Sequence, residues 1–164
     1  MSNFESMLFS DSLKMSLNNL AMSKTFNRFD ADDLVQQTYL KALERQDQFK
    51  GDNIDPWAIT ILKNLFIDST RKKREQLLGD DNLEIPMNDE SSSVLLERDK
   101  DMCLKGLSDN EREIISLKQS NSYDEISEIL DIKPGTLRQS LSRAKEKFMR
   151  CMGFFDEWEW QNLN

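Results

Sequence analysis

The chain has 164 residues, of which 38% are hydrophobic and 32% are charged, and its formal net charge is −8. This length suits one ordinary domain or two small ones, and the composition is that of a folded chain rather than a disordered one. No apolar stretch reaches the roughly 20 residues of a membrane-spanning helix, and residues 1–20 lack the blocks of a signal peptide. We therefore expect a cytoplasmic protein.

The composition also argues against catalysis. The chain contains no histidine, which removes the commonest general base and the commonest metal ligand. Its two cysteines, Cys103 and Cys151, match no metal-binding or redox spacing, so we interpret them as reduced, partly buried thiols. We expect no enzymatic activity, no catalytic residue, no metal and no cofactor.

Residues 1–75 are predicted to form a helical domain, because apolar residues recur at helical spacing without strand-like alternation. The first of three helices would cover residues 5–23, and the second would begin with Asp30 as its N-cap. The third would cover residues 56–74, with Pro56 in its first turn. The apolar sides of the first two helices would contain Phe4, Leu8, Leu13, Met15, Leu17, Leu20, Met22, Leu34, Thr38, Leu40, Ala42 and Leu43.

A polar, acidic segment with a glycine, a proline and three consecutive serines follows, so residues 76–94 are predicted to be a flexible linker. Residues 95–152 are predicted to form a second helical unit, followed by a tail at residues 153–164. The expected fold class is all-α, with two small helical domains joined by a flexible acidic linker. The apolar positions of the second domain are Leu104, Leu107, Ile114, Ile115, Leu117, Ile126, Ile129, Leu130, Leu137 and Leu141.

Positive charge is concentrated in two islands of this acidic chain. Residues 63–74 carry five Lys or Arg and one Asp, and residues 133–150 carry six Lys or Arg and one Glu. Such islands suit local contacts with phosphate, although solvated helix faces would have the same composition. The acidic remainder fits a protein that meets DNA only when a larger partner presents it.

Residues 122–145 have the two-helix rhythm of a helix-turn-helix. If Leu137 and Leu141 face the core, the outward side of the second helix carries Thr136, Arg138, Gln139, Ser142 and Arg143. Arginine and glutamine can each make paired hydrogen bonds to base edges in the major groove. The alternative is a helical hairpin that packs against another protein.

Several segments resemble those of one protein family. LSDNEREIISL (107–117), SYDEISEIL (122–130) and PGTLRQSLSRAK (134–145) resemble region 4, the promoter-reading C-terminal domain of bacterial sigma factors. DADDLVQQTYLKAL (30–43) resembles the core-polymerase-binding helix of region 2 in the extracytoplasmic-function (ECF) group. PWAITILKNLFIDSTRKKR (56–74) resembles the following helix, which binds the minus-ten element. The resemblance covers about residues 4–150.

The resemblance implies a sigma region 2 domain of three helices and a region 4 helix-turn-helix domain. It also implies a protein that binds core RNA polymerase and directs promoter recognition, promoter melting and transcription initiation. The polymerase surfaces would be the β′ clamp helices and the β flap. The implied core-polymerase-binding residues are Asp33, Leu34, Gln36, Gln37, Tyr39 and Leu40, of which Leu34 is equally well explained as a core residue.

The family further implies two DNA-binding sets. A loop at residues 49–55 would capture a flipped base of the minus-ten element, with Asn53 at its edge. We assign Trp57, which follows this loop, to the core rather than to a stacking platform. The minus-ten set is Asn53, Lys63, Asn64, Arg71, Lys72, Lys73 and Arg74, and the minus-35 set is Thr136, Arg138, Gln139, Ser142 and Arg143.

Two positions depart from the family pattern. Asp131 stands where a glycine is usual at the turn, which requires an aspartate in a left-handed conformation. Ser142 replaces a larger residue, so the promoter sequence that is read cannot be inferred from relatives.

Two other functions fit parts of the sequence. A sigma mimic would sequester an anti-sigma factor or another regulator without initiating transcription, but it would not need the retained basic residues. A helix-turn-helix repressor would leave the polymerase-binding motif unexplained. The aromatic residues of the acidic tail would either bind an anti-sigma factor or recruiting protein, or fold back on region 4. These residues are Phe154, Phe155, Trp158 and Trp160.

Overall fold

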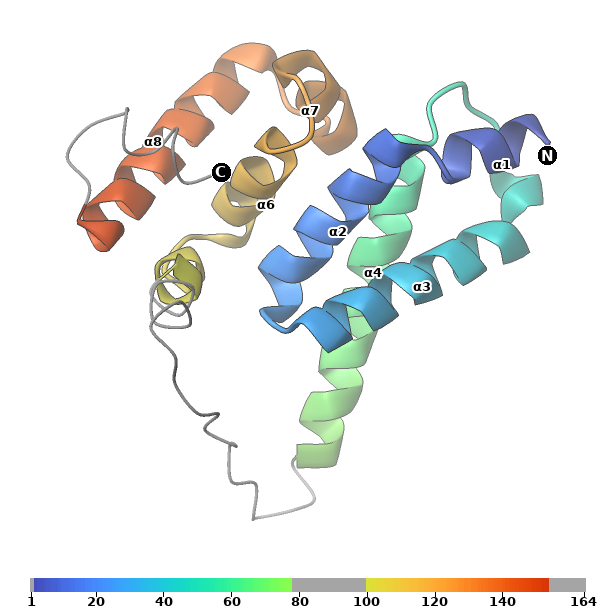
Figure 1. Cartoon of the computed structure of the whole chain (residues 1–164), viewed down its shortest axis with the longest axis horizontal. Coiled ribbons are helices and arrows are strands. Elements are labelled where there is room, and N and C mark those ends of the chain that lie inside the picture. Colours follow the sequence, from blue (N-terminus) through green and yellow to red (C-terminus); the bar gives the residue numbers. More distant parts are fainter. Residues whose placement is uncertain (1, 78–99, 154–164) are drawn as a thin grey trace.

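The computed structural model describes residues 2–77 and 100–153, and all the regular secondary structure in these two ranges is helical (Figure 1). The expected all-α fold class is confirmed. Most of the predicted linker and residues 154–164 of the tail lie outside the described residues. None of the described helices is both long enough and apolar enough to cross a membrane.

The first module, residues 2–77, contains four α-helices and one short 3-10 helix. They are α1 (Asn3–Leu8), α2 (Asp11–Thr25), α3 (Arg28–Glu44), η1 (Gln46–Gln48) and α4 (Asp55–Leu77). The second module, residues 100–153, begins with helical residues 100–105. It continues with α6 (Asp109–Lys118), α7 (Tyr123–Leu130) and α8 (Pro134–Met152).

The predicted helix over residues 5–23 is in fact two helices. Ser10 is the N-cap of α2, because its hydroxyl oxygen accepts a hydrogen bond from the backbone N–H of Leu13. The prediction that Met15 and Met22 belong to the apolar side of this helix is wrong, since their exposed fractions are 53% and 40%. Both lie about 200° around the helix from the buried Leu13, on the opposite side.

The N-cap of α3 is Asn27 rather than Asp30. The side-chain oxygen of Asn27 accepts hydrogen bonds from the backbone N–H groups of Phe29 and Asp30, at 2.9 and 3.3 Å. The buried stripe of α3 contains Leu34, Thr38 and Ala42, as predicted. Leu40 was expected in the same stripe but is 63% exposed, because it lies about 200° from Thr38.

Aromatic rings fasten the start of α4 to α1. The ring of Trp57 lies 5.4 Å from that of Phe49 and 6.0 Å from that of Phe4, measured between centroids. Trp57 is partly buried in this cluster. The assignment of Trp57 to the packed interior is therefore confirmed.

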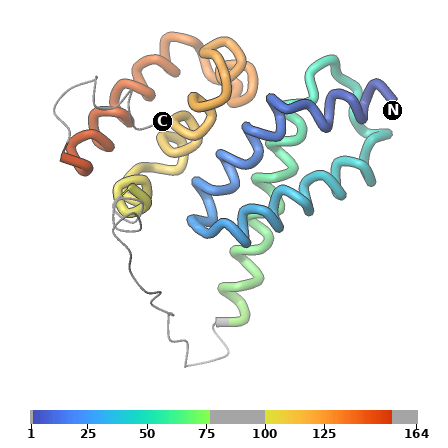
Figure 2. The backbone as a smooth tube through the Cα atoms, viewed as in Figure 1, coloured from blue at the N-terminus to red at the C-terminus, as the bar shows by residue number. Residues whose placement is uncertain are grey.

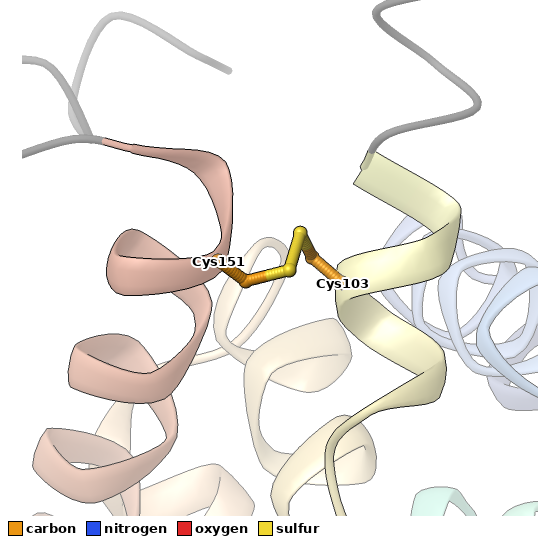
Figure 3. Close-up of a disulfide and its surroundings, with 2 residues drawn as sticks. All are labelled: Cys103 and Cys151. Carbon is orange, nitrogen blue, oxygen red and sulfur yellow. A yellow bond between two sulfur atoms is a disulfide. The ribbon is translucent and has the colours of Figure 1, made fainter.

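The interpretation of both cysteines as reduced thiols is wrong. Cys103 and Cys151 form a disulfide, with their Cα atoms 5.6 Å apart (Figure 3). The bond joins the helical turn at residues 100–105 to the last turn of α8. Because the two cysteines are 48 residues apart, the sequence did not indicate that the two ends of this module are neighbours.

The two modules pack against each other. Helix α2 lies beside α6, and α4 contacts α7 (Figures 1 and 2). The buried apolar residues of both modules belong to one hydrophobic cluster, which extends from Leu8 to Phe148. Residues that lie far apart in the sequence therefore meet between the modules.

Candidate nucleic-acid and polymerase interfaces

Helix α8 has one buried side and one polar side. Its side chains Leu137, Leu141, Ala144 and Phe148 recur every three or four residues and are buried. The opposite side is exposed and brings together all five residues of the predicted minus-35 set, Thr136, Arg138, Gln139, Ser142 and Arg143. This face has the donors and acceptors that a major-groove contact requires.

The turn before α8 is fixed by local hydrogen bonds. Ser122 and Glu125 form a capping box at the start of α7, in which the Ser122 N–H donates to the Glu125 carboxylate at 2.6 Å. At the other end of α7, Asp131 has φ 52° and ψ 47°. The expected left-handed aspartate is therefore confirmed, and it directs the chain into α8.

Tyr123 is a residue at this face that sequence analysis missed. Its ring lies 4.8 Å from the Lys118 ammonium nitrogen and 5.9 Å from the Arg138 guanidinium carbon. Cations at these distances from an aromatic face are attracted to it. Tyr123 thus helps to orient Arg138. The sequence did not indicate this contact, because the two residues belong to different helices.

The exposed side of α3 carries most of the predicted polymerase-binding residues. Asp33, Gln36, Gln37 and Leu40 are all exposed. The side-chain amide of Gln37 donates to the Asp33 carboxylate at 2.6 Å. Phe29 is 86% exposed and lies on the same side of α3, a position that the sequence analysis did not single out.

Two predicted polymerase-binding residues are less accessible. Leu34 is 6% exposed and packs in the core, so it is removed from the set of candidate contacts. Tyr39 is half-buried, with its ring 5.4 Å from that of Phe9. Burial raises the pKa of the Tyr39 hydroxyl.

The predicted minus-ten loop lies at the start of α4. Asn53 is exposed, and its side-chain oxygen accepts a hydrogen bond from the Asp55 N–H at 3.1 Å. Burial raises the pKa of Asp55, and the nearby carboxylates of Glu125 and Glu128 on α7 raise it further. The loop of the first module is therefore close to acidic residues of the second.

The basic residues of α4 fall into two groups. Arg71, Lys72, Lys73 and Arg74 are exposed in the C-terminal half of this helix, and Asn64 of the same predicted set is exposed near its middle. Arg71 lies 3.9 Å from Asp68, and Lys73 lies 3.8 Å from Asp30. These exposed ion pairs are weak, so the cations can exchange to another anion.

Lys63 is in a different environment. Its ammonium group lies 2.9 Å from one carboxylate oxygen of Glu113, while Lys24 lies 2.9 Å from the other. Glu113 belongs to α6 and is only 4% exposed. The sequence gave no indication of this contact between modules. Within the described ranges, no cluster of acidic or cysteine side chains has the arrangement of a metal site.

Two family models match the chain, in the order that the motifs predict. The model described as Sigma-70 region 2 matches residues 12–76, and the model described as Sigma-70, region 4 matches residues 101–148.

Known proteins show the same similarity along most of the chain. The chain is 33% identical to the ECF RNA polymerase sigma factor EcfG of Rhodopseudomonas palustris (strain TIE-1), over 80% of this chain and 76% of that protein. It is 29% identical to the ECF RNA polymerase sigma factor SigM of Bacillus subtilis (strain 168), over 77% and 82%. Among solved structures it is similar to the sigma factor RpoE in complex with the anti-sigma factor NepR from Bartonella quintana. The TM-score is 0.64 at 30% identity, covering 87% of this chain and 92% of that one.

Proposed function

This chain belongs to the ECF group of RNA polymerase sigma factors, and from that premise we propose how its residues divide the work of initiation. As a sigma factor, it binds core RNA polymerase, recognises the promoter and directs transcription initiation. A sigma mimic without an initiation role is not favoured. The proposed units are a region 2 domain at residues 1–75, a linker at 76–94, a region 4 domain at 95–152 and a tail at 153–164.

The proposed polymerase-binding surface is the exposed side of α3. Asp33, Gln36, Gln37 and Leu40 would contact the β′ clamp helices, and Phe29 would extend the contact by one turn. Support comes from their exposure on one side of a helix whose other side is buried. An apolar centre with an acidic and amide surround suits a basic partner helix. Region 4 would contact the β flap.

The proposed minus-ten surface is the loop before α4 together with the exposed part of α4. Asn53 would contact an extruded base through its amide N–H group, because its side-chain oxygen already accepts a hydrogen bond from the Asp55 N–H. The phosphates and separated strands would be held by Lys63, Asn64, Arg71, Lys72, Lys73 and Arg74. The concentration of cations on one exposed helix supports this assignment.

The proposed minus-35 surface is the exposed side of α8. Arg138, Gln139 and Ser142 would contact base edges, while Thr136 and Arg143 would contact the backbone. Their shared side of α8, opposite the buried Leu137 and Leu141, is the observation that supports this assignment.

Several further properties are also proposals. We infer a cytoplasmic protein that has no catalytic role or cofactor of its own and leaves nucleotidyl transfer to the polymerase. An anti-sigma factor or a recruiting protein is a further partner, as the related RpoE structure with NepR suggests for this family. Phe154, Phe155, Trp158 and Trp160 of the tail are candidates for that contact.

The observation that carries the whole proposal is one chain in which a Sigma-70 region 2 match precedes a region 4 match, each range containing a helix with exposed cations, α4 or α8. The test is run-off transcription by purified bacterial core polymerase on a pooled promoter library at low salt, with and without this protein. New transcripts that share minus-35 and minus-ten sequences are expected. If no new transcript starts and no complex with core polymerase forms, the proposed function is wrong.

A further inference from the structure

The contact between the modules is centred on a buried carboxylate. Glu113 of α6 is 4% exposed, and each of its oxygens lies 2.9 Å from a lysine of the first module, Lys24 of α2 or Lys63 of α4. A carboxylate is costly to bury unless it is paired, so Glu113 depends on these two cations. If the modules separated, water would replace the lysines around Glu113.

The side chains around this pair are also largely polar. The Asn121 amide donates to the Ser16 hydroxyl at 2.9 Å, which joins α6 to α2. The ring of Phe26, at the end of α2, lies 4.9 Å from the ammonium of Lys105 and 5.6 Å from the guanidinium of Arg112. The contact also has an apolar part, because the buried apolar residues of both modules belong to one cluster. Contacts between domains of one chain resemble those of transient complexes, so a contact with this polar part is compatible with separation of the modules.

The same contact covers part of the proposed minus-ten surface. The ammonium of Lys63 is paired with Glu113, so contact with a phosphate would have to replace this ion pair. Helix α7 contacts α4, and its Glu125 and Glu128 lie near Asp55, directly after the loop that carries Asn53. Acidic groups of the second module therefore lie where the backbone of DNA would approach, and they would repel it.

We propose that the packed arrangement of the two modules is a self-inhibited form of this sigma factor, held by Glu113 between Lys24 and Lys63. The modules separate at α2–α6 and α4–α7 when the protein engages polymerase and promoter DNA, which frees Lys63 for a phosphate. This inference rests on the proposed minus-ten role of Lys63. With a closed form of this kind, the apparent affinity for promoter DNA equals the affinity of the open form multiplied by the fraction of molecules that are open.

The test compares Glu113→Gln with a matched control, Asp11→Asn. Asp11 is an exposed carboxylate in the first turn of α2, so its substitution removes one negative charge away from Glu113 and from the proposed polymerase and DNA surfaces. Small-angle X-ray scattering of the free full-length chain measures the radius of gyration. Promoter-complex formation with core polymerase, at limiting sigma factor, measures the functional effect.

We expect Glu113→Gln to increase the radius of gyration and to form promoter complexes about tenfold faster, whereas Asp11→Asn matches the wild type. Equal radii and equal rates for all three proteins would overturn the inference. If circular dichroism shows that Glu113→Gln has lost its helices, Lys24→Gln replaces it, because Lys24 is in the contact but outside the proposed DNA-binding set. The same increases are expected for Lys24→Gln, and their absence would overturn the inference.

The two measurements also separate this inference from the proposed function. If the wild type starts no promoter-specific transcript, the proposed function fails, and with it the inhibitory meaning of the contact. If the wild type is active but neither variant expands or accelerates, only the inference fails.

Discussion

The side-chain amide nitrogen of Asn121 lies 2.9 Å from the hydroxyl oxygen of Ser16, although the two residues are 105 positions apart. Asn121 also donates to the carbonyl oxygen of Leu117 at 3.0 Å, and both of these hydrogen bonds are buried. Asn121→Ala removes these buried side-chain hydrogen bonds, so we expect the free energy of unfolding to fall by about 1–3 kcal/mol. Urea denaturation measures the change. The control Asn64→Ala, at an exposed position of α4, should change stability by less than about 0.5 kcal/mol.

Leu40→Asp should weaken binding to core polymerase at least tenfold, because it places a charge at the centre of the proposed α3 surface. Leu40 is 63% exposed, so the fold should tolerate the change. Fluorescence anisotropy with purified core polymerase measures the dissociation constant. Met15→Asp is the matched control, since Met15 is 53% exposed on α2, away from this surface. Equal affinities for both variants would exclude Leu40 from the interface.

Arg138→Ala and Arg143→Ala should affect promoter use differently. Arg138 is proposed to contact base edges, so its loss should cost about 1–3 kcal/mol and relax the preference at one minus-35 position. Arg143 is proposed to contact a phosphate, so its loss should weaken all promoters similarly and reduce the salt dependence by about one ion. Promoter-library transcription at several salt concentrations separates the two effects. Identical profiles for the two variants would contradict the assigned roles.

Reduction of the disulfide between Cys103 and Cys151 should destabilise the second module. The bond closes a loop between residues 48 positions apart, which corresponds to a stabilisation of about 2–4 kcal/mol. Thermal unfolding with and without dithiothreitol measures the effect. The reduced protein is the relevant form for a cytoplasmic chain, because the cytoplasm keeps most cysteines reduced. The melting temperature of the double variant Cys103→Ser/Cys151→Ser should be the same with and without dithiothreitol. A wild-type melting temperature that is independent of reductant would show that the bond contributes nothing to stability.

Local patterns in the sequence predicted the helices well, because spacing and capping act over a few residues. The buried Leu137 and Leu141 defined the exposed side of α8 correctly. Errors arose where the apolar, core-facing side of a helix was assumed to be wider than it is, as at Met15 and Leu40. Contacts between distant segments, such as Lys63 with Glu113 and Tyr123 with Arg138, could not be predicted, because no periodic signal reports which helices become neighbours.

Glu111 should make the stability of the second module depend on pH. Hydrogen bonds from the Lys147 ammonium and the Ser108 backbone N–H hold the pKa of Glu111 below its ordinary value. Because the folded-state pKa is lowered, the ionised carboxylate stabilises the fold above the ordinary glutamate pKa. This contribution is lost as the pH falls through the lowered pKa.

Glu111→Gln should therefore be less stable than the wild type at pH 7, by a difference that shrinks steadily below about pH 4. Urea unfolding at a series of pH values measures this difference, and a constant difference across the series would show that ionisation of Glu111 does not contribute. Glu146→Gln, which removes an exposed pair with Arg150 in the last turns of α8, provides the control for a general change in charge.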